Sequence, residues 1–358
     1  MKILGIGIWT TLIERCTVTL ADIKEKLKSD DYRFLREHES LGSNIILLTL
    51  GGSYAYGTDT VMSDIDIRGC AVDSAKDIIL SESFNQVVET ITDTTIYAFS
   101  KLVNLLTNTN PNTIELLGNR PEHYFYISKI GQLLLDNAHL FLSQQAVHSF
   151  GGYANSQLRR LTNRAAGLQD QASQEQHILD SIKYAESSFN YQSFGDSNFI
   201  HLYIDKATVP DMNSEIFMDV KLSHYPLRDY LGLWSEYNSI VRSYSSLGKR
   251  NNQAVEHKKI GKHMMHLVRL YLMCFDILEK EQIVTYRVKE HDLLMDIRNG
   301  KYLDSNEKPI AEFYELIDSL KKRLDYAKEN TSLPEKPDYG TITDFKLSIL
   351  TDIVRNSL

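Results

Sequence analysis

Cysteine is scarce in this sequence, with three residues among 358. Cys16, Cys70 and Cys274 are far apart and odd in number, so they form neither a metal-binding spacing nor a disulfide framework. Structural disulfides belong to oxidising compartments, and their absence suits a protein of the reducing cytosol. We therefore expect a cytoplasmic protein.

Long apolar runs and an excess of positive charge are also absent. Arg269 and Asp276 interrupt the best candidate for a membrane span, so we expect no membrane partner. The net charge of -8 excludes a protein that coats nucleic acid through a broadly basic surface. A local basic patch remains compatible with this charge.

The most informative segment that is present begins with the apolar run 45–50. This run predicts a buried strand that ends at Gly51-Gly52. Glycines lack side chains, so backbone N–H groups at such a turn can approach a phosphate closely. Ser53 adds a hydroxyl at the same place. Alone, a Gly-Gly pair is more often a tight turn, and the residues after it in the chain decide between the two interpretations.

Polar and apolar residues alternate over 63–67. A strand over 64–72 would direct Asp64 and Asp66 to one side and apolar neighbours into the core. Two adjacent carboxylates repel each other unless a cation lies between them. Mg²⁺ held by carboxylates and substrate phosphates is the usual solution in proteins. The glycine turn followed by Asp-x-Asp therefore favours metal-assisted phosphoryl transfer.

Two further carboxylates lie in the next segment that is predicted to form a strand. The segment 87–96 is rich in Val, Thr and Ile and predicts one strand, on which Glu89 and Asp93 would share a face. A carboxylate there can help to hold a metal and can act as general base towards a hydroxyl. Glu89 is better explained as a solvent-facing strand residue.

Length and hydrophobic content predict two domains. The strand patterns end early, and the sequence after residue 124 is mostly helical. We predict a small mixed-sheet α/β (α+β) catalytic domain over 1–120 and a larger, mostly helical domain over 121–358. In the helix predicted over 259–281, one face carries Lys262, His266 and Arg269. This face either packs in the domain or presents cations to a triphosphate.

These residues resemble a known family. Gly52-Ser53, Tyr56-Gly57 and the run Ser63-Asp64-x-Asp66-x-Arg68-Gly69 are similar to the signature of the DNA polymerase beta superfamily of nucleotidyltransferases. The closest likeness is to its predicted bacterial and phage branch, typified by the YcgL-like proteins. Later blocks of that branch are matched by Asp93 to Tyr97 with Lys101, Asn110 to Asn112, Ile114 to Leu117, and Lys262 with His266 and Arg269.

The resemblance implies an enzyme that transfers a nucleoside monophosphate from an NTP such as ATP to a hydroxyl, with release of pyrophosphate. It implies two-metal-ion catalysis with two Mg²⁺ ions, or Mn²⁺ in their place, and it selects Asp93 as the third carboxylate. Asp64, Asp66 and Asp93 would be the catalytic metal ligands. The nucleotide-binding residues would be Gly52, Ser53, Tyr56, Gly57, Ser63, Lys101, Lys262, His266 and Arg269.

The acceptor is left open by these motifs. RNA such as the end of a tRNA, a protein side chain and a small molecule are all compatible with them. A second hypothesis is a nucleotide-binding regulator or antitoxin-like partner protein, which would bind the nucleotide without turnover. A plain structural protein would leave the combination of turn, Asp-x-Asp and third carboxylate unexplained.

Overall fold

The chain divides into two compact units. The first comprises Met1–Gly152, Arg269–Met295 and Leu320–Leu358, and the second comprises Tyr153–Val268 and Asp296–Ser319. The computed structural model describes residues 18–166, 176, 178–180, 199–208, 214–227, 230–232, 234–235, 237–238, 259–305 and 308–356. Within those ranges, every helix is too short or too polar to cross a membrane.

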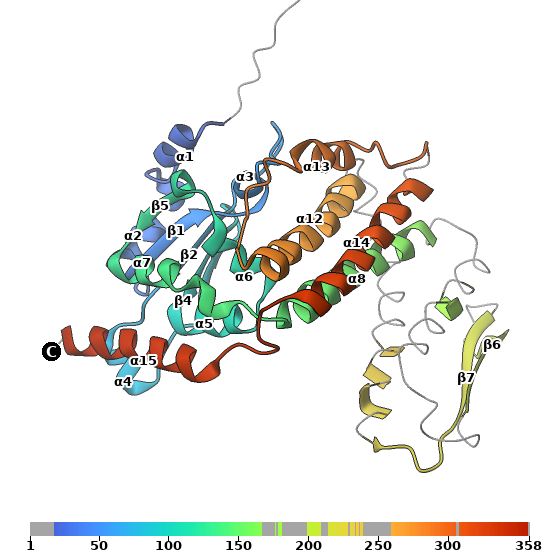
Figure 1. The fold of residues 1–358 in the computed structure, drawn as a ribbon. Helices are drawn as coiled ribbons and strands as arrows, with labels where there is room; N and C mark the ends of the chain where they lie inside the picture. Colours follow the sequence, from blue (N-terminus) through green and yellow to red (C-terminus); the bar gives the residue numbers. More distant parts are fainter. Residues whose placement is uncertain are drawn as a thin grey trace, which may run out of the picture. The chain divides into compact units, whose positions relative to one another are not determined.

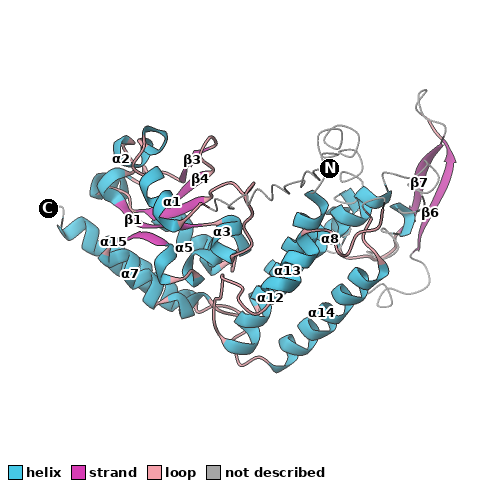
Figure 2. Cartoon of the chain, turned by 90° about the horizontal axis from the view of Figure 1, so that it is seen from above, coloured by secondary structure: helices cyan, strands magenta, loops and turns pink. Residues whose placement is uncertain are grey.

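A mixed five-stranded sheet forms the centre of the first unit, in the order β3-β4-β2-β1-β5. Only β2 and β4 run parallel, and the other three pairs are antiparallel. Figure 2 shows these strands in magenta with helices beside them. The strands are β1 (Ile45–Leu50), β2 (Ile67–Ala71), β3 (Gln86–Glu89), β4 (Thr94–Ala98) and β5 (Tyr124–Ile127). The predicted α/β class is confirmed.

All six residues of β1 are buried, as the apolar run predicts. Helix α5 (Phe99–Thr107) packs against β2 and β4, and helix α7 (Lys129–Asp136) packs against β1 and β5. A Cβ on Gly131 of α7 would lie 2.1 Å from the carbonyl oxygen of Ile46, so the helix reaches the strand only because this residue is glycine.

Further helices complete the first unit. Helix α15 (Tyr339–Asn356) packs against α4 and α5, and Figure 1 shows the three side by side. The remaining elements are α1 (Leu20–Lys26), η1 (Asp30–Tyr32), α2 (Phe34–Glu37), η2 (Gly42–Asn44), α3 (Gly52–Tyr56), α4 (Ala75–Leu80), α6 (Pro111–Ile114), η3 (Glu115–Gly118), η4 (Pro121–His123) and η5 (Ala138–Phe141).

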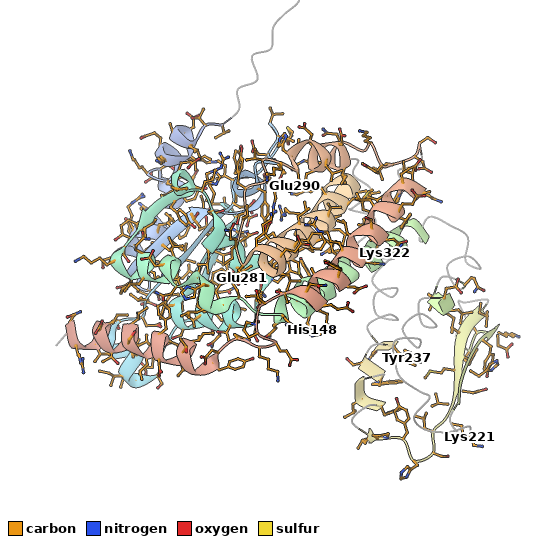
Figure 3. All side chains as sticks on the ribbon, viewed as in Figure 1. His148, Lys221, Tyr237, Glu281, Glu290 and Lys322 are labelled. Carbon is orange, nitrogen blue, oxygen red and sulfur yellow. The ribbon has the colours of Figure 1, made fainter. Side chains whose placement is uncertain are left out.

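The first unit also includes residues from late in the chain, so it extends beyond the expected domain 1–120. The segment after α12 (Lys259–Lys280) returns to the early elements. Thr285 donates its hydroxyl to the Glu115 carbonyl at 2.7 Å, and the Arg287 N–H donates to the Tyr56 carbonyl at 3.1 Å. Glu281, which begins this return, is labelled in Figure 3.

The second unit is helical apart from one hairpin, over the residues that the structure describes. Strands β6 (Phe199–Lys206) and β7 (Ser214–Lys221) pair antiparallel along eight residues each. This unit contains the later part of α8 (Gln145–Ala166), the first part of α12, the end of α13 (His291–Arg298) and the start of α14 (Ala311–Asn330). Its buried side chains include Met264, Leu267, Ile297, Phe313 and Ile317.

Candidate active site

The glycine turn lies where β1 passes into α3. Gly51 caps the helix in an extended conformation, and Gly52 has a positive φ of 56°. A Cβ on Gly52 would lie 1.8 Å from the Asp66 Oδ2 atom. Only glycine therefore allows the Asp66 carboxylate to lie against this turn. The N–H groups of the first turn of α3 have no intrahelical acceptor, as in any α-helix.

Asp64 and Asp66 do not lie on a strand, and in this respect the prediction of a strand over 64–72 is wrong. Strand β2 begins at Ile67, opposite Leu50, the last residue of β1. Because β1 ends at the glycine turn, residues 64 and 65 have no strand beside them. The Gly51 N–H still donates to the Asp66 carbonyl at 2.9 Å, so Asp66 is held next to the turn. Asp64 is exposed, whereas Asp66 is half-buried.

Asp93 lies on a turn, because the single strand predicted over 87–96 is in fact a hairpin. Strands β3 and β4 pair antiparallel, with Glu89 opposite Thr94. The chain reverses between them, so Glu89 and Asp93 do not share a strand face. Asp93 has a φ of 44°. Asp adopts this left-handed region more readily than most residues, which explains why the reversal ends here.

Arg68 joins Asp66 and Asp93. Its Nη2 atom donates to Asp66 Oδ1 at 3.1 Å and to Asp93 Oδ1 at 3.2 Å. Its Nη1 atom donates to the carbonyl oxygens of Ile67 at 3.0 Å and Asp93 at 2.6 Å. We call Asp66 and Asp93 the carboxylate pair. Residues 27 positions apart in the chain thus meet at one guanidinium, next to the glycine turn.

The electrostatics of the carboxylate pair favour a cation. Burial, a hydrogen bond that protonated Asp66 donates to the Asp93 carboxylate, and the negative charge of Asp93 together raise the pKa of Asp66 to about 7, whereas Arg68 lowers it. Ionisation of Asp66 therefore costs more free energy in the folded protein than in the unfolded chain. Additional positive charge at this position would favour the ionised form of Asp66.

The donor atoms of these residues suit a divalent cation, whereas their geometry suits it only in part. The carboxylate pair supplies hard oxygen donors, which suit Mg²⁺. No group of three or more His, Cys, Asp or Glu side chains in the described part of the chain has the geometry to hold a metal. The exposed Asp64 therefore does not join the pair in this conformation. Asp66 and Asp93 thus have donors that suit the cation, and Asp64 would have to move towards them to complete a three-ligand site.

A second acid and arginine arrangement lies in the interior, and the motifs gave no role for its acid. The Tyr56 hydroxyl donates to Glu115 Oε2 at 2.6 Å, and the Arg269 guanidinium lies 3.5 Å from the Tyr56 ring centroid. We call Tyr56, Glu115 and Arg269 the buried network. Burial raises the pKa of Glu115, which Arg269 and the Tyr56 hydrogen bond oppose.

Two members of the buried network are among the residues predicted from the sequence to bind nucleotide. Tyr56 and Arg269 were predicted to bind nucleotide, yet Tyr56 is 1% and Arg269 9% exposed, and both face Glu115. Since Glu115 comes from η3 and Arg269 from α12, only the tertiary fold brings them together. In the sequence, the one signal for this network is that Glu115 is a charged residue within an apolar block.

The other predicted nucleotide-binding residues lie in several places. Ser53 is buried on α3, and the Ser63 hydroxyl accepts a hydrogen bond from the Thr60 N–H at 2.9 Å. Gly57 ends α3 with a φ of 69°. Lys101 is half-buried on α5, while on α12 Lys262 is exposed and His266 half-buried with its ring 5.7 Å from that of Tyr153.

The mixed sheet, the glycine turn and the carboxylate pair are typical of a nucleotidyltransferase domain. Residues 21–179 match the RlaP family model, whose description is the RNA repair pathway DNA polymerase beta family. The matched residues carry the sheet and the carboxylate pair, and the match is consistent with a nucleotidyltransferase of the DNA polymerase beta superfamily. No curated protein and no solved structure matches the chain.

Proposed function

We propose that the protein transfers a nucleoside monophosphate from an NTP to a hydroxyl acceptor and releases pyrophosphate. The observation that carries this proposal is the meeting of Asp66 and Asp93 at Arg68, beside Gly52. A phosphate-sized turn and an excess of carboxylate are thus adjacent. The family match supports nucleotidyl transfer as the reaction class.

In the proposed reaction, a bond forms between the acceptor oxygen and the α-phosphorus, and the bond from that phosphorus to the oxygen bridging to the β-phosphate breaks. Asp66 and Asp93, with Asp64, would hold the divalent cations, Mg²⁺ or Mn²⁺. Such ions neutralise phosphate charge and favour ionisation of a hydroxyl. Positioning and charge neutralisation then dominate, because in-line displacement needs little covalent chemistry from the protein.

Asp93 is the better candidate for proton removal from the acceptor. Its side chain is 56% exposed, against 18% for that of Asp66, so an incoming hydroxyl reaches it more easily. The N–H groups of Gly52 and Ser53 would bind the β- and γ-phosphates, since they open a helix and the turn carries little side-chain bulk.

RNA is the acceptor class that we favour. The family description names an RNA repair pathway, and a polynucleotide end offers the hydroxyl that the reaction requires. The net charge of -8 is compatible with an RNA acceptor, because binding the end of one RNA strand needs only a local binding site. Protein side chains and small molecules are the competing acceptors.

A nucleotide-binding regulator without turnover is the second candidate function. It is favoured by one observation: Asp64 is exposed and lies outside any three-donor group in the described residues. In that case the protein would bind the NTP at the glycine turn but leave it intact. Recovery of unchanged NTP from the complex would identify this behaviour.

The experiment that tests the proposal uses α-labelled NTPs. The purified protein is incubated with each NTP, Mg²⁺ or Mn²⁺, and a lysate separated into RNA, protein and small-molecule fractions. We expect label in the RNA fraction, and none with Asp66→Asn. Label in the protein or small-molecule fraction would keep the reaction and change the acceptor. No label in any fraction, with the NTP intact, would overturn the proposal.

A further inference from the structure

Arg68 makes four hydrogen bonds, and three of them go to the two residues of the carboxylate pair. Nη2 contacts one oxygen of Asp66 and one of Asp93, and Nη1 contacts the backbone carbonyls of Ile67 and Asp93. The Arg68 side chain is 19% exposed. The two carbonyl contacts hold the guanidinium in place independently of either carboxylate. Its charge therefore stays beside the pair when another ligand binds there.

The glycine turn leaves room for this side chain. A Cβ on Gly51 would lie 2.7 Å from the Arg68 Cγ atom and 3.5 Å from the Asp66 Cβ atom. Gly51 thus admits the arginine, and Gly52 admits the Asp66 carboxylate. Local backbone geometry is adapted to an arginine at this position as well as to the turn itself.

Asp93 lies on a turn, so its position depends on the contacts that Arg68 makes with it. Asp93 lies on a turn with a positive φ, and its side chain is more than half exposed. The Asp93 carbonyl accepts from the Ile67 N–H at 3.2 Å and from Arg68 Nη1 at 2.6 Å. Strand β2 and Arg68 together therefore hold the turn against the strand.

We propose that Arg68 is an internal cation of the carboxylate pair, which keeps the affinity for a free divalent cation low and makes metal binding depend on the nucleotide. This inference rests on the proposed function. Arg68 neutralises much of the charge that would attract a free ion. An NTP contributes several further negative charges, so the metal enters with its phosphates. Arg68 contacts no reacting atom and is a positioning residue.

Removal of Arg68 has two opposing effects on metal binding. Loss of the hydrogen bonds to Asp93 loosens one ligand, which weakens metal binding by an amount typical of hydrogen bonds to charged groups. Loss of a full positive charge within hydrogen-bonding distance of both ligands strengthens the attraction for a divalent ion. The second effect is larger because the removed charge is close, partly buried and repels a double charge.

The test is binding of Mn²⁺ alone, measured without nucleotide by the loss of the electron paramagnetic resonance signal of the free ion. We expect Arg68→Met to bind Mn²⁺ about tenfold or more tightly than the wild type. Arg68→Lys keeps the charge and should stay close to the wild type. Arg33→Met, which removes an exposed arginine paired with Glu37, is the matched control.

A third variant shows whether any gain arises at the carboxylate pair. Combining Arg68→Met with Asp93→Asn should abolish the gain in Mn²⁺ affinity. Circular dichroism confirms the fold of each variant, and Arg68→Gln replaces Arg68→Met if that variant does not fold. Affinity of the neutral variant equal to or below that of the wild type would overturn the inference. So would a gain that persists without Asp93.

Failure of the inference and failure of the proposed function are distinguishable in the same preparations. If the wild type transfers label but Arg68→Met gains no Mn²⁺ affinity, only the role of Arg68 is wrong. If no variant transfers label while Arg68→Met gains affinity, the proposed function is wrong and the role of Arg68 in excluding the free ion stands.

Discussion

The carboxylate pair and the buried network use the same residue types in different proportions. At the pair, Asp66 and Asp93 share one arginine, and their side chains are 18% and 56% exposed. In the network, Glu115 accepts from Tyr56, its largest favourable charge is Arg269 with Arg68 a smaller one, and all three network residues are almost fully buried. Charge is balanced in the interior and in negative excess beside the glycine turn.

This difference indicates the roles of the two regions. A buried acid with its own arginine and a hydroxyl donor has its polar requirements met, which stabilises a unique arrangement of α3, η3 and α12. Two acids that share one arginine leave charge uncompensated, and such an excess marks a ligand site more often than a structural one. We therefore expect catalysis to depend on the first region and stability on the second.

The largest expected effect is that of Asp66→Asn on nucleotidyl transfer. The substitution removes a metal ligand but keeps the size and shape of the side chain, so activity should fall by roughly a thousandfold or more while the fold persists. Rates from α-labelled NTP and melting curves measure both properties. Asp344→Asn, on the exposed part of α15, is the control. Transfer at the wild-type rate by Asp66→Asn would end the enzyme interpretation.

Asp93 and Glu89 provide the next comparison. Asp93→Ala should reduce the rate by several orders of magnitude, because it removes the carboxylate that meets Asp66 at Arg68. Glu89→Ala should be mild, since Glu89 lies on the other side of the β3–β4 turn and its Oε1 atom accepts from the Ile91 N–H at 3.1 Å. The reverse ranking would show that the wrong acid has been assigned.

In the buried network, Arg269→Met should act on stability first. It leaves Glu115 buried without its arginine, which typically costs about 3 to 5 kcal/mol of unfolding free energy. Arg33→Met, an exposed arginine, should cost at most about 1 kcal/mol. Urea unfolding measures both. A destabilisation of Arg269→Met as small as that of the control, with NTP binding weakened and NMP binding retained, would instead support the predicted triphosphate contact.

The smallest effect concerns pH. Because the pKa of Asp66 is raised from 3.8 to about 7, the folded protein binds more protons than the unfolded chain between these values. The wild type should therefore lose stability as pH rises from about 4 to 7, relative to Asp66→Asn. Melting temperatures at pH 5 and 7 in the presence of a chelator test this. An equal difference at both pH values would show that Asp66 titrates normally.

The sequence predicted the elements that depend on local patterns. Strand β1 has the predicted bounds because its apolar run is continuous. Pro111 begins α6, where its fixed φ suits the first helical position. The glycine turn also lies where the pattern placed it. These features depend on residues close together in the chain, where periodicity and the conformational limits of glycine and proline carry the information.

Local patterns failed where a distant segment decides the structure. Residues 64–66 could form a strand only if β1 continued beside them, and β1 ends at Leu50. The chain reversal before Thr94 depends on the left-handed conformation of Asp93, within a run of β-forming residues. Glu115 and Arg269 interact although they are more than 150 positions apart, and such an interaction produces no periodic pattern in the sequence. Tertiary pairing determines all three.

The most direct test of the central claim compares two labels with one acceptor. Purified protein is incubated with Mg²⁺, an acceptor RNA and an NTP that carries its label at either the α- or the γ-phosphate. We predict that the RNA gains the α-label, that the γ-label appears in pyrophosphate, and that Asp66→Asn does neither. Transfer of the γ-label to the acceptor, or no transfer of either label with the NTP recovered intact, would contradict the proposed nucleotidyl transfer.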